Sequence, residues 1–197
     1  MKLKLIIKII VLLLFFSCKN SKEGVVKKFY YPREASFLKK ENYEVLNFKS
    51  FKNFEDLIDS LQGLNYYDKK AYIKVEKNKQ EYNILVSTTF GKGMPPFLKF
   101  KNILSISKDS ILKEKKYSIG DLISVLKKDL LNYGKDDRYS DSPEKLVVSL
   151  TCKIDELESL LMKVVTMFNE IKEHSSDSLK LNIFLNRRIE IFPPPPI

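Results

Sequence analysis

The chain has 197 residues, of which 44% are apolar and 30% are charged, and its formal net charge is +10 at pH 7. This apolar content, with 13 phenylalanines and 10 tyrosines, excludes a wholly disordered chain. Basic residues are interspersed with acidic ones and form no cluster interleaved with aromatic residues, which argues against a nucleic-acid-binding protein.

The first residues have the three zones of a bacterial secretory signal. Three lysines among the first eight residues form a positive region, residues 9–16 are all apolar, and Ser17 is small. The apolar run is too short for a membrane-spanning helix, which needs about 20 apolar residues. We therefore expect residues 1–17 to be a cleaved signal peptide, and losing its three lysines lowers the net charge from +10 to +7.

The stretch LFFSC at residues 14–18 resembles the lipobox of bacterial lipoproteins, in which the cysteine is acylated and the chain is cut just before it. The resemblance implies a lipidated Cys18 and a membrane partner reached through the acyl chains, because two or more chains give durable binding. Phe15 and Phe16 depart from the commoner residues of that motif. An ordinary cleaved signal, or a short membrane anchor in which Cys18 is incidental, is the alternative.

Lys19 stands where many lipoproteins kept at the inner membrane have an aspartate. We therefore expect a lipid-anchored protein of the bacterial cell envelope, at the periplasmic face of the outer membrane. In residues 18–36, polar residues, Gly24 and Pro32 interrupt any helical or strand periodicity, which predicts a tether between the anchor and the folded part.

Residues 37–96 predict a smaller αβ segment. GKGMPP at its end combines glycines and prolines and marks a boundary. The expected elements are a strand at 42–48, a helix at 53–63 that begins at Asn53 and ends at Gly63, and two strands within 71–90 that turn near Asn78 and Lys79.

Residues 97–192 predict a C-terminal αβ domain, and residues 193–197 a proline-rich tail. Alternating strands and amphipathic helices indicate an α+β fold, with a small mixed sheet of ββαβαβ order and two helices on one face. The expected elements are strands at 97–107 and 111–116, a helix at 118–132 capped by Ser118, an inner strand at 145–152, a helix at 155–173 capped by Asp155, and a strand at 179–192.

Three stretches carry a family resemblance: ILSISKDSILKEKKYSIGDLISVL, KLVVSLTCKIDELESLLMKVVTMFNEI and LKLNIFLNR. Their order resembles the periplasmic domain of the ExbD/TolR family, accessory subunits of proton-driven envelope motors, over about residues 100–190. The family carries an aspartate in an N-terminal transmembrane helix, whereas residues 1–17 contain no carboxylate. The resemblance therefore implies a dimerising or ligand-binding envelope domain without proton coupling.

No linear motif of catalysis, cofactor binding or metal binding is evident, so we expect no enzyme, no cofactor and no metal site. Cys152 is expected to be a buried apolar residue, and His174 lies at a helix end. Asp136, Asp137 and Asp141 lack the spacing of a calcium loop, and a solvated loop is favoured.

The sequence thus favours a membrane-anchored binding or scaffolding module whose partner is an envelope protein or peptidoglycan. A homodimer is left open. The alternatives are an immunity or inhibitor lipoprotein and an envelope enzyme without a recognisable linear motif.

Overall fold

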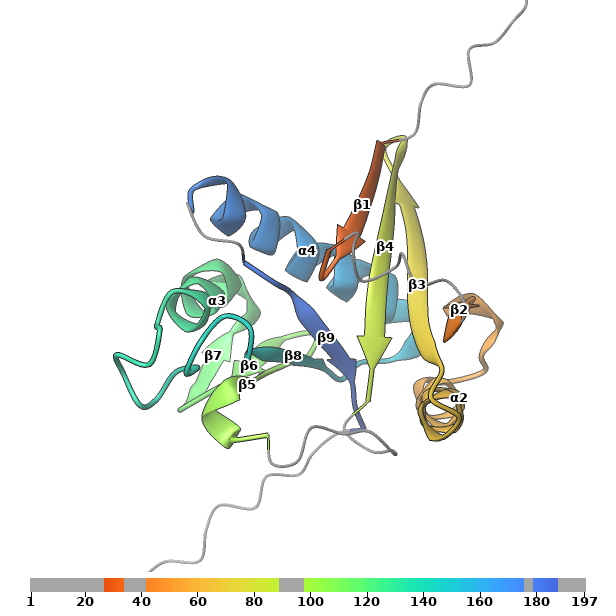
Figure 1. Cartoon of the computed structure of the whole chain (residues 1–197), viewed down its shortest axis with the longest axis horizontal. Helices are drawn as coiled ribbons and strands as arrows, with labels where there is room; N and C mark the ends of the chain where they lie inside the picture. Colours follow the sequence, from red (N-terminus) through yellow and green to blue (C-terminus); the bar gives the residue numbers. More distant parts are fainter. Residues whose placement is uncertain (1–26, 34–41, 89–97, 176–178, 188–197) are drawn as a thin grey trace, which may run out of the picture.

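The computed structural model describes residues 27–33, 42–88, 98–175 and 179–187. Within these ranges the chain forms three helices and one mixed sheet of nine strands, which confirms the predicted α+β class (Figure 1). Eight strands follow the order β2-β3-β4-β9-β8-β5-β6-β7, and β1 also pairs with β4. The strands are β1 (Lys27–Tyr31), β2 (Tyr43–Leu46), β3 (Lys70–Lys77), β4 (Gln80–Ser87), β5 (Ile103–Ile106), β6 (Ser110–Leu112), β7 (Lys116–Ser118), β8 (Val147–Leu150) and β9 (Asn182–Leu185), and the helices are α2 (Phe54–Tyr66), α3 (Leu122–Leu130) and α4 (Leu157–Glu173).

The hairpin of β3 and β4 is built around the predicted turn. Asn78 and Lys79 have φ angles of 52° and 59°, the left-handed geometry of a two-residue hairpin turn whose twist matches the strands. Antiparallel pairing then runs from Lys77 opposite Gln80 to Ala71 opposite Val86. The prediction of two strands joined at this turn is confirmed.

Helix α2 begins where the sequence predicts but ends later. The Asn53 side chain accepts a hydrogen bond of 2.8 Å from the backbone N–H of Asp56, which makes it the N-cap. The expected end at Gly63 is wrong, because the helix continues to Tyr66. Gly63 has no atom within 4 Å of the position of an added Cβ, so neither close packing nor a turn requires glycine there.

The C-terminal part departs from the predicted ββαβαβ order by one strand. The single strand expected at 111–116 is two strands, β6 and β7, which pair as an antiparallel hairpin. The interruption falls at Lys113, whose side chain turns into the interior. The observed order of this part is therefore βββαβαβ.

Strand β8 has the predicted inner position, between β5 and β9, and both of its pairings are parallel. Helices α3 and α4 contact one another, and Figure 1 shows α4 behind β9. The N-cap predicted at Asp155 is wrong, because a 3₁₀ turn at Ile154–Glu156 precedes α4 and is capped at Lys153. The side chain of Glu156 accepts from the Lys153 backbone N–H at 3.2 Å.

The two predicted αβ segments share one sheet. Val86 and Ser87 of β4 pair in parallel with Ile183 and Phe184 of β9, and buried residues of both segments form one hydrophobic core. The first half of β4 pairs on that edge with β1, which lies inside the stretch expected to be a tether. Within the stretch expected to be a tether, residues 27–31 are therefore a strand. The boundary expected at 91–96 lies outside the described residues.

Candidate functional site

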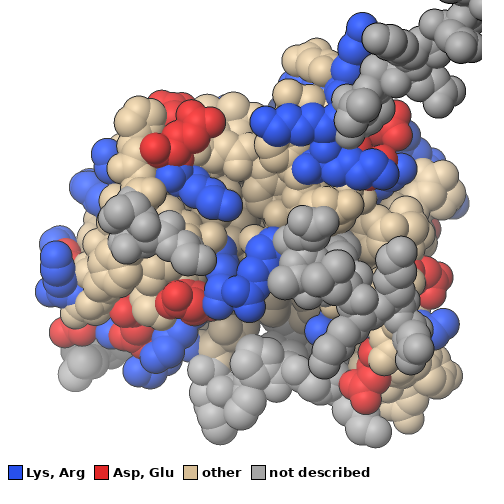
Figure 2. All heavy atoms as spheres, turned by 45° about the horizontal axis from the view of Figure 1, so that its top comes forward, with Lys and Arg blue, Asp and Glu red and all other residues tan. Residues whose placement is uncertain are grey.

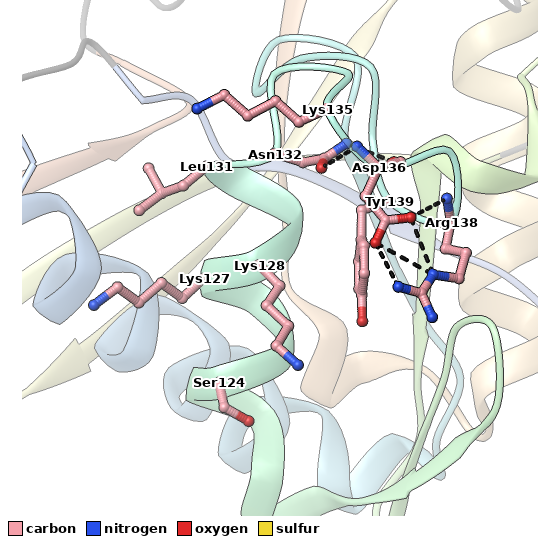
Figure 3. A pocket seen from close by; sticks show the side chains of 9 residues that line it. All are labelled: Ser124, Lys127, Lys128, Leu131, Asn132, Lys135, Asp136, Arg138 and Tyr139. Carbon is pink, nitrogen blue, oxygen red and sulfur yellow. Dashed lines mark hydrogen bonds and ion pairs between the residues drawn. The ribbon is translucent and has the colours of Figure 1, made fainter.

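A groove runs along α3 and the loop that joins α3 to β8 (residues 131–146). Its volume is about 600 Å³, and it is open to solvent (Figure 3). It is lined by Ser124, Lys127, Lys128, Leu131, Asn132, Lys135, Asp136, Arg138 and Tyr139. We call this set the basic groove.

The basic groove has an excess of positive charge. Four of its residues are lysine or arginine, and Asp136 is its one acidic residue. The Asp136 carboxylate accepts hydrogen bonds from the Arg138 guanidinium at 2.7–3.2 Å, and these bonds lower its pKa to about 2. Because this pair is internally neutral, the positive charge comes from the three lysines.

The cations are distributed over both sides of the groove. In the view of Figure 3, Lys128 extends toward the ring of Tyr139, whereas Lys127 and Lys135 extend to the opposite side. The guanidinium of Arg138 lies 6.0 Å from the centre of the Tyr139 ring. Lys128 and the Tyr139 ring therefore lie on the same side of the groove, so a bound anion could pair with the ammonium beside an apolar surface.

A buried ion pair lies beneath the loop. Lys113 Nζ is 2.8 Å from Asp129 Oδ1, and the side chains are 2% and 0% exposed. The Lys113 ammonium also donates to the backbone carbonyls of Lys101 at 2.5 Å and Ile103 at 3.2 Å. Burial lowers the pKa of Lys113 and raises that of Asp129, since desolvation disfavours both charges, and their mutual attraction opposes the two shifts.

This ion pair also holds the loop. The backbone N–H of Ser140 donates to Asp129 Oδ1 at 2.8 Å, so one carboxylate oxygen binds both the lysine and the loop. The other oxygen, Oδ2, is buried and has no hydrogen-bond partner among the described residues. An unsatisfied buried oxygen is costly, so this carboxylate depends on Lys113 for its stability.

Two asparagines fix the rest of the loop. Asn132 donates to the carbonyls of Asp136 and Ser140 and accepts from the Asp136 N–H, at 2.8–2.9 Å. Asn102 accepts from the Ser140 hydroxyl at 3.1 Å and from the Asp141 N–H at 2.9 Å. The backbone that carries Asp136, Arg138 and Tyr139 is therefore organised before any ligand arrives, which reduces the entropy cost of binding.

The carboxylates considered for calcium each have a cation of the chain as partner. Asp136 pairs with Arg138, Asp137 lies 3.2 Å from Lys101, and Asp141 lies 2.6 Å from Lys101. Hydrogen bonds from Lys101 are the main cause that lowers the pKa of Asp141 to about 2. Within the described ranges, no three histidine, cysteine, aspartate or glutamate side chains are grouped so that they could hold a metal ion.

The remaining residues singled out in the sequence lie apart from the basic groove. Cys152 is half-buried against the core, and burial raises the pKa of its thiol to about 12, so the nucleophilic thiolate is suppressed. His174 ends α4, with Nδ1 2.8 Å from the Glu170 carbonyl oxygen. Cys18 lies outside the described residues, and none of the described helices is long and apolar enough to cross a bilayer.

The sequence interpretation missed the buried ion pair, although α3 carries a signal for it. Asp129 is three residues after Leu126 and seven after Leu122, which places it on the apolar stripe of the helix. A carboxylate at such a position needs a buried partner. The periodicity gives no indication of which lysine supplies it, because Lys113, which follows β6, reaches α3 only in the folded chain.

No protein-family model matches this chain, and no curated protein or solved structure matches it either. The ExbD/TolR resemblance therefore remains a prediction from the order of the elements.

Proposed function

We propose that this chain is a lipid-anchored protein of the bacterial envelope, acylated at Cys18, that binds an anionic partner in the basic groove. The partner is peptidoglycan or an acidic surface of another envelope protein, and the anchor lies in the periplasmic face of the outer membrane. An ExbD/TolR-like binding role without proton coupling is compatible with this proposal.

The observation that carries the binding role is the rigid, positively charged groove. None of its three lysines lies within 4 Å of a carboxylate oxygen of the described residues, and its loop is held by Asn102, Asn132 and the ion pair beneath it. Lysines in the last turn of a helix also complement the helix dipole, which accounts for Lys127 and Lys128 but not for Lys135 and Arg138 in the loop.

Acylation is tested by growing the host with a labelled fatty acid. The wild-type protein should take up the label and the Cys18→Ser variant should not. Equal labelling of both proteins would remove the lipoprotein from the proposal.

Ligand binding is tested by sedimenting the purified protein with isolated peptidoglycan sacculi. The double variant Lys128→Glu with Lys135→Glu should lose sedimentation, whereas Lys52→Glu with Lys163→Glu should keep it. The control carries the same charge change at exposed lysines outside the groove. If both variants behave alike, only net charge matters, and the basic groove is not the binding site.

Reproducible turnover of a substrate, abolished by one polar substitution, would favour the enzyme alternative.

A further inference from the structure

A second group of lysines lies at one end of the sheet, away from the basic groove. Strand β1 begins at Lys27, which pairs with Gln80 at the start of β4, and β3 ends at Lys77 on the other side of β4. The hairpin turn adds Lys79. We call Lys27, Lys28, Lys77 and Lys79 the lysine tip, and all four are exposed.

The carboxylates near the lysine tip are already paired. Glu81 lies 2.7 Å from Lys74 and 3.3 Å from Lys28, and Glu76 lies 3.8 Å from Lys74. Lys27, Lys77 and Lys79 have no carboxylate partner among the described residues. Figure 2 shows basic side chains gathered at this end of the molecule beside a few acidic ones.

An aromatic pair supports the lysine tip. The rings of Phe29 and Tyr82 stack with their centres 5.1 Å apart, and Lys27 Nζ lies 4.9 Å from the centre of the Phe29 ring. Both rings are half-buried, so each has a face or edge toward solvent. Tyrosine rings are enriched at the headgroup level of membranes, where lysines also bind anionic headgroups.

The position of the lysine tip in the chain connects it to the anchor. Lys27 lies nine positions after Cys18, with eight residues between them. Because an extended chain spans at most about 3.5 Å per residue, the start of β1 can lie no more than about 30 Å from an acylated Cys18. The lysine tip contains the start of β1, so an acylated Cys18 would limit how far the tip can lie from the bilayer.

We propose that the lysine tip docks on the anionic headgroups of the membrane that holds the Cys18 lipids. This inference rests on the proposed acylation for its geometry. The charge complementarity is independent of acylation and acts over about one Debye length, roughly 10 Å at moderate salt. Docking would orient the fold so that the basic groove stays accessible to its ligand, because α3, which lines the groove, lies away from the β3–β4 turn (Figure 1).

The test measures cosedimentation of the unacylated protein with phospholipid vesicles. The probe is the chain from residue 18 onward with Cys18→Ser, which keeps every described element because these begin at Lys27. It should bind vesicles that contain phosphatidylglycerol, and this binding should be lost at high salt. It should bind vesicles of phosphatidylcholine alone weakly or not at all. Each lysine near an anionic surface contributes about fivefold in affinity, so Lys77→Gln with Lys79→Gln should weaken binding roughly 25-fold.

The matched control is Lys128→Gln with Lys135→Gln, which removes the same charge from the basic groove. It should leave vesicle affinity unchanged. Equal weakening by both double variants, or no binding to the anionic vesicles, would overturn the proposal. Uptake of the fatty-acid label by the wild-type protein reports separately on Cys18. If the wild type takes up no label while the vesicle affinity still depends on the lysine tip, the anchor is refuted and the membrane surface of the tip stands.

Discussion

Two buried carboxylates, Asp129 and Glu81, bind lysines in different surroundings. Asp129 has one lysine, and both side chains are enclosed. Glu81 has two lysines, Lys28 and Lys74, whose side chains are 53% and 41% exposed. Water therefore solvates the cations at Glu81 but not the cation at Asp129.

The pKa values of the two carboxyl groups respond in opposite directions. Burial alone would raise the pKa of Glu81, but hydrogen bonds from Lys74, Asn83 and Lys28 together lower it to about 2. Burial raises the pKa of Asp129, and its partner only partly offsets this. The stability of the fold therefore depends on the ion pair under the loop. Each pair near the lysine tip is a surface contact that contributes little to the free energy of unfolding.

The largest loss of stability is expected from a substitution that buries a carboxylate with no lysine partner. Leu150 is fully buried in β8, so Leu150→Asp should leave the protein unfolded, with a loss of at least about 5 kcal/mol. Lys180→Asp, at a half-buried polar position, should cost less than about 1 kcal/mol. Circular dichroism during thermal unfolding would show both effects, and two unchanged transitions would mean that the strand register is wrong.

Breaking the enclosed pair should have the next largest effect. Asp129→Ala leaves the Lys113 ammonium buried without a counter-charge, and we expect a loss of about 3–5 kcal/mol in urea unfolding. The double variant Lys113→Met with Asp129→Leu removes both charges and should recover most of this loss. A cost of Asp129→Ala below about 1 kcal/mol would show that the pair is solvated.

Glu81→Gln should have a small effect that depends on pH. Because the pKa of Glu81 is lowered in the folded state, its contribution is present above the unfolded value of 4.5 and is lost as the pH falls toward about 2. We expect a difference of about 1 kcal/mol or less from wild type at neutral pH, since the lysines are exposed. Urea midpoints of both proteins across this range should converge as the pH falls, and a difference that grows instead would reverse the assigned direction.

The lysines of the basic groove should matter least for stability. Lys128→Glu with Lys135→Glu should change the free energy of unfolding by no more than about 0.5 kcal/mol, because both side chains are exposed. Urea unfolding of this variant is also the control for its loss of ligand binding. A large destabilisation would mean that these lysines hold the loop rather than a ligand.

The sequence predicted the parts of the fold that depend on local chemistry. The turn at Asn78 and Lys79, the cap at Asn53 and the inner place of β8 follow from neighbouring residues. Pairing of β4 with β9 joins residues almost a hundred positions apart, and no local pattern specifies it. The split between β6 and β7 was missed for the same reason, because it depends on Lys113 reaching Asp129 in another element.

The candidate site was less predictable than the fold. The basic groove is assembled from α3 and a polar loop whose charges look ordinary in the sequence, and only the hydrogen bonds of Asn102 and Asn132 show that the loop is fixed. The lysine tip combines the ends of three strands, one of which was expected to be a tether. The lysine tip is therefore a product of strand pairing, and the basic groove is a product of hydrogen bonds that fix its loop.

We expect the lysine tip to face the membrane and the basic groove to face away from it. The direct test attaches an environment-sensitive fluorophore to Glu76→Cys, beside Lys77 of the lysine tip, and, separately, to Lys135→Cys in the basic groove, in acylated protein carrying Cys152→Ala. On vesicles containing phosphatidylglycerol, the probe at position 76 should shift to the blue and be quenched by a headgroup quencher, and the probe at position 135 should not respond. Quenching at position 135, or at neither position, would contradict the account.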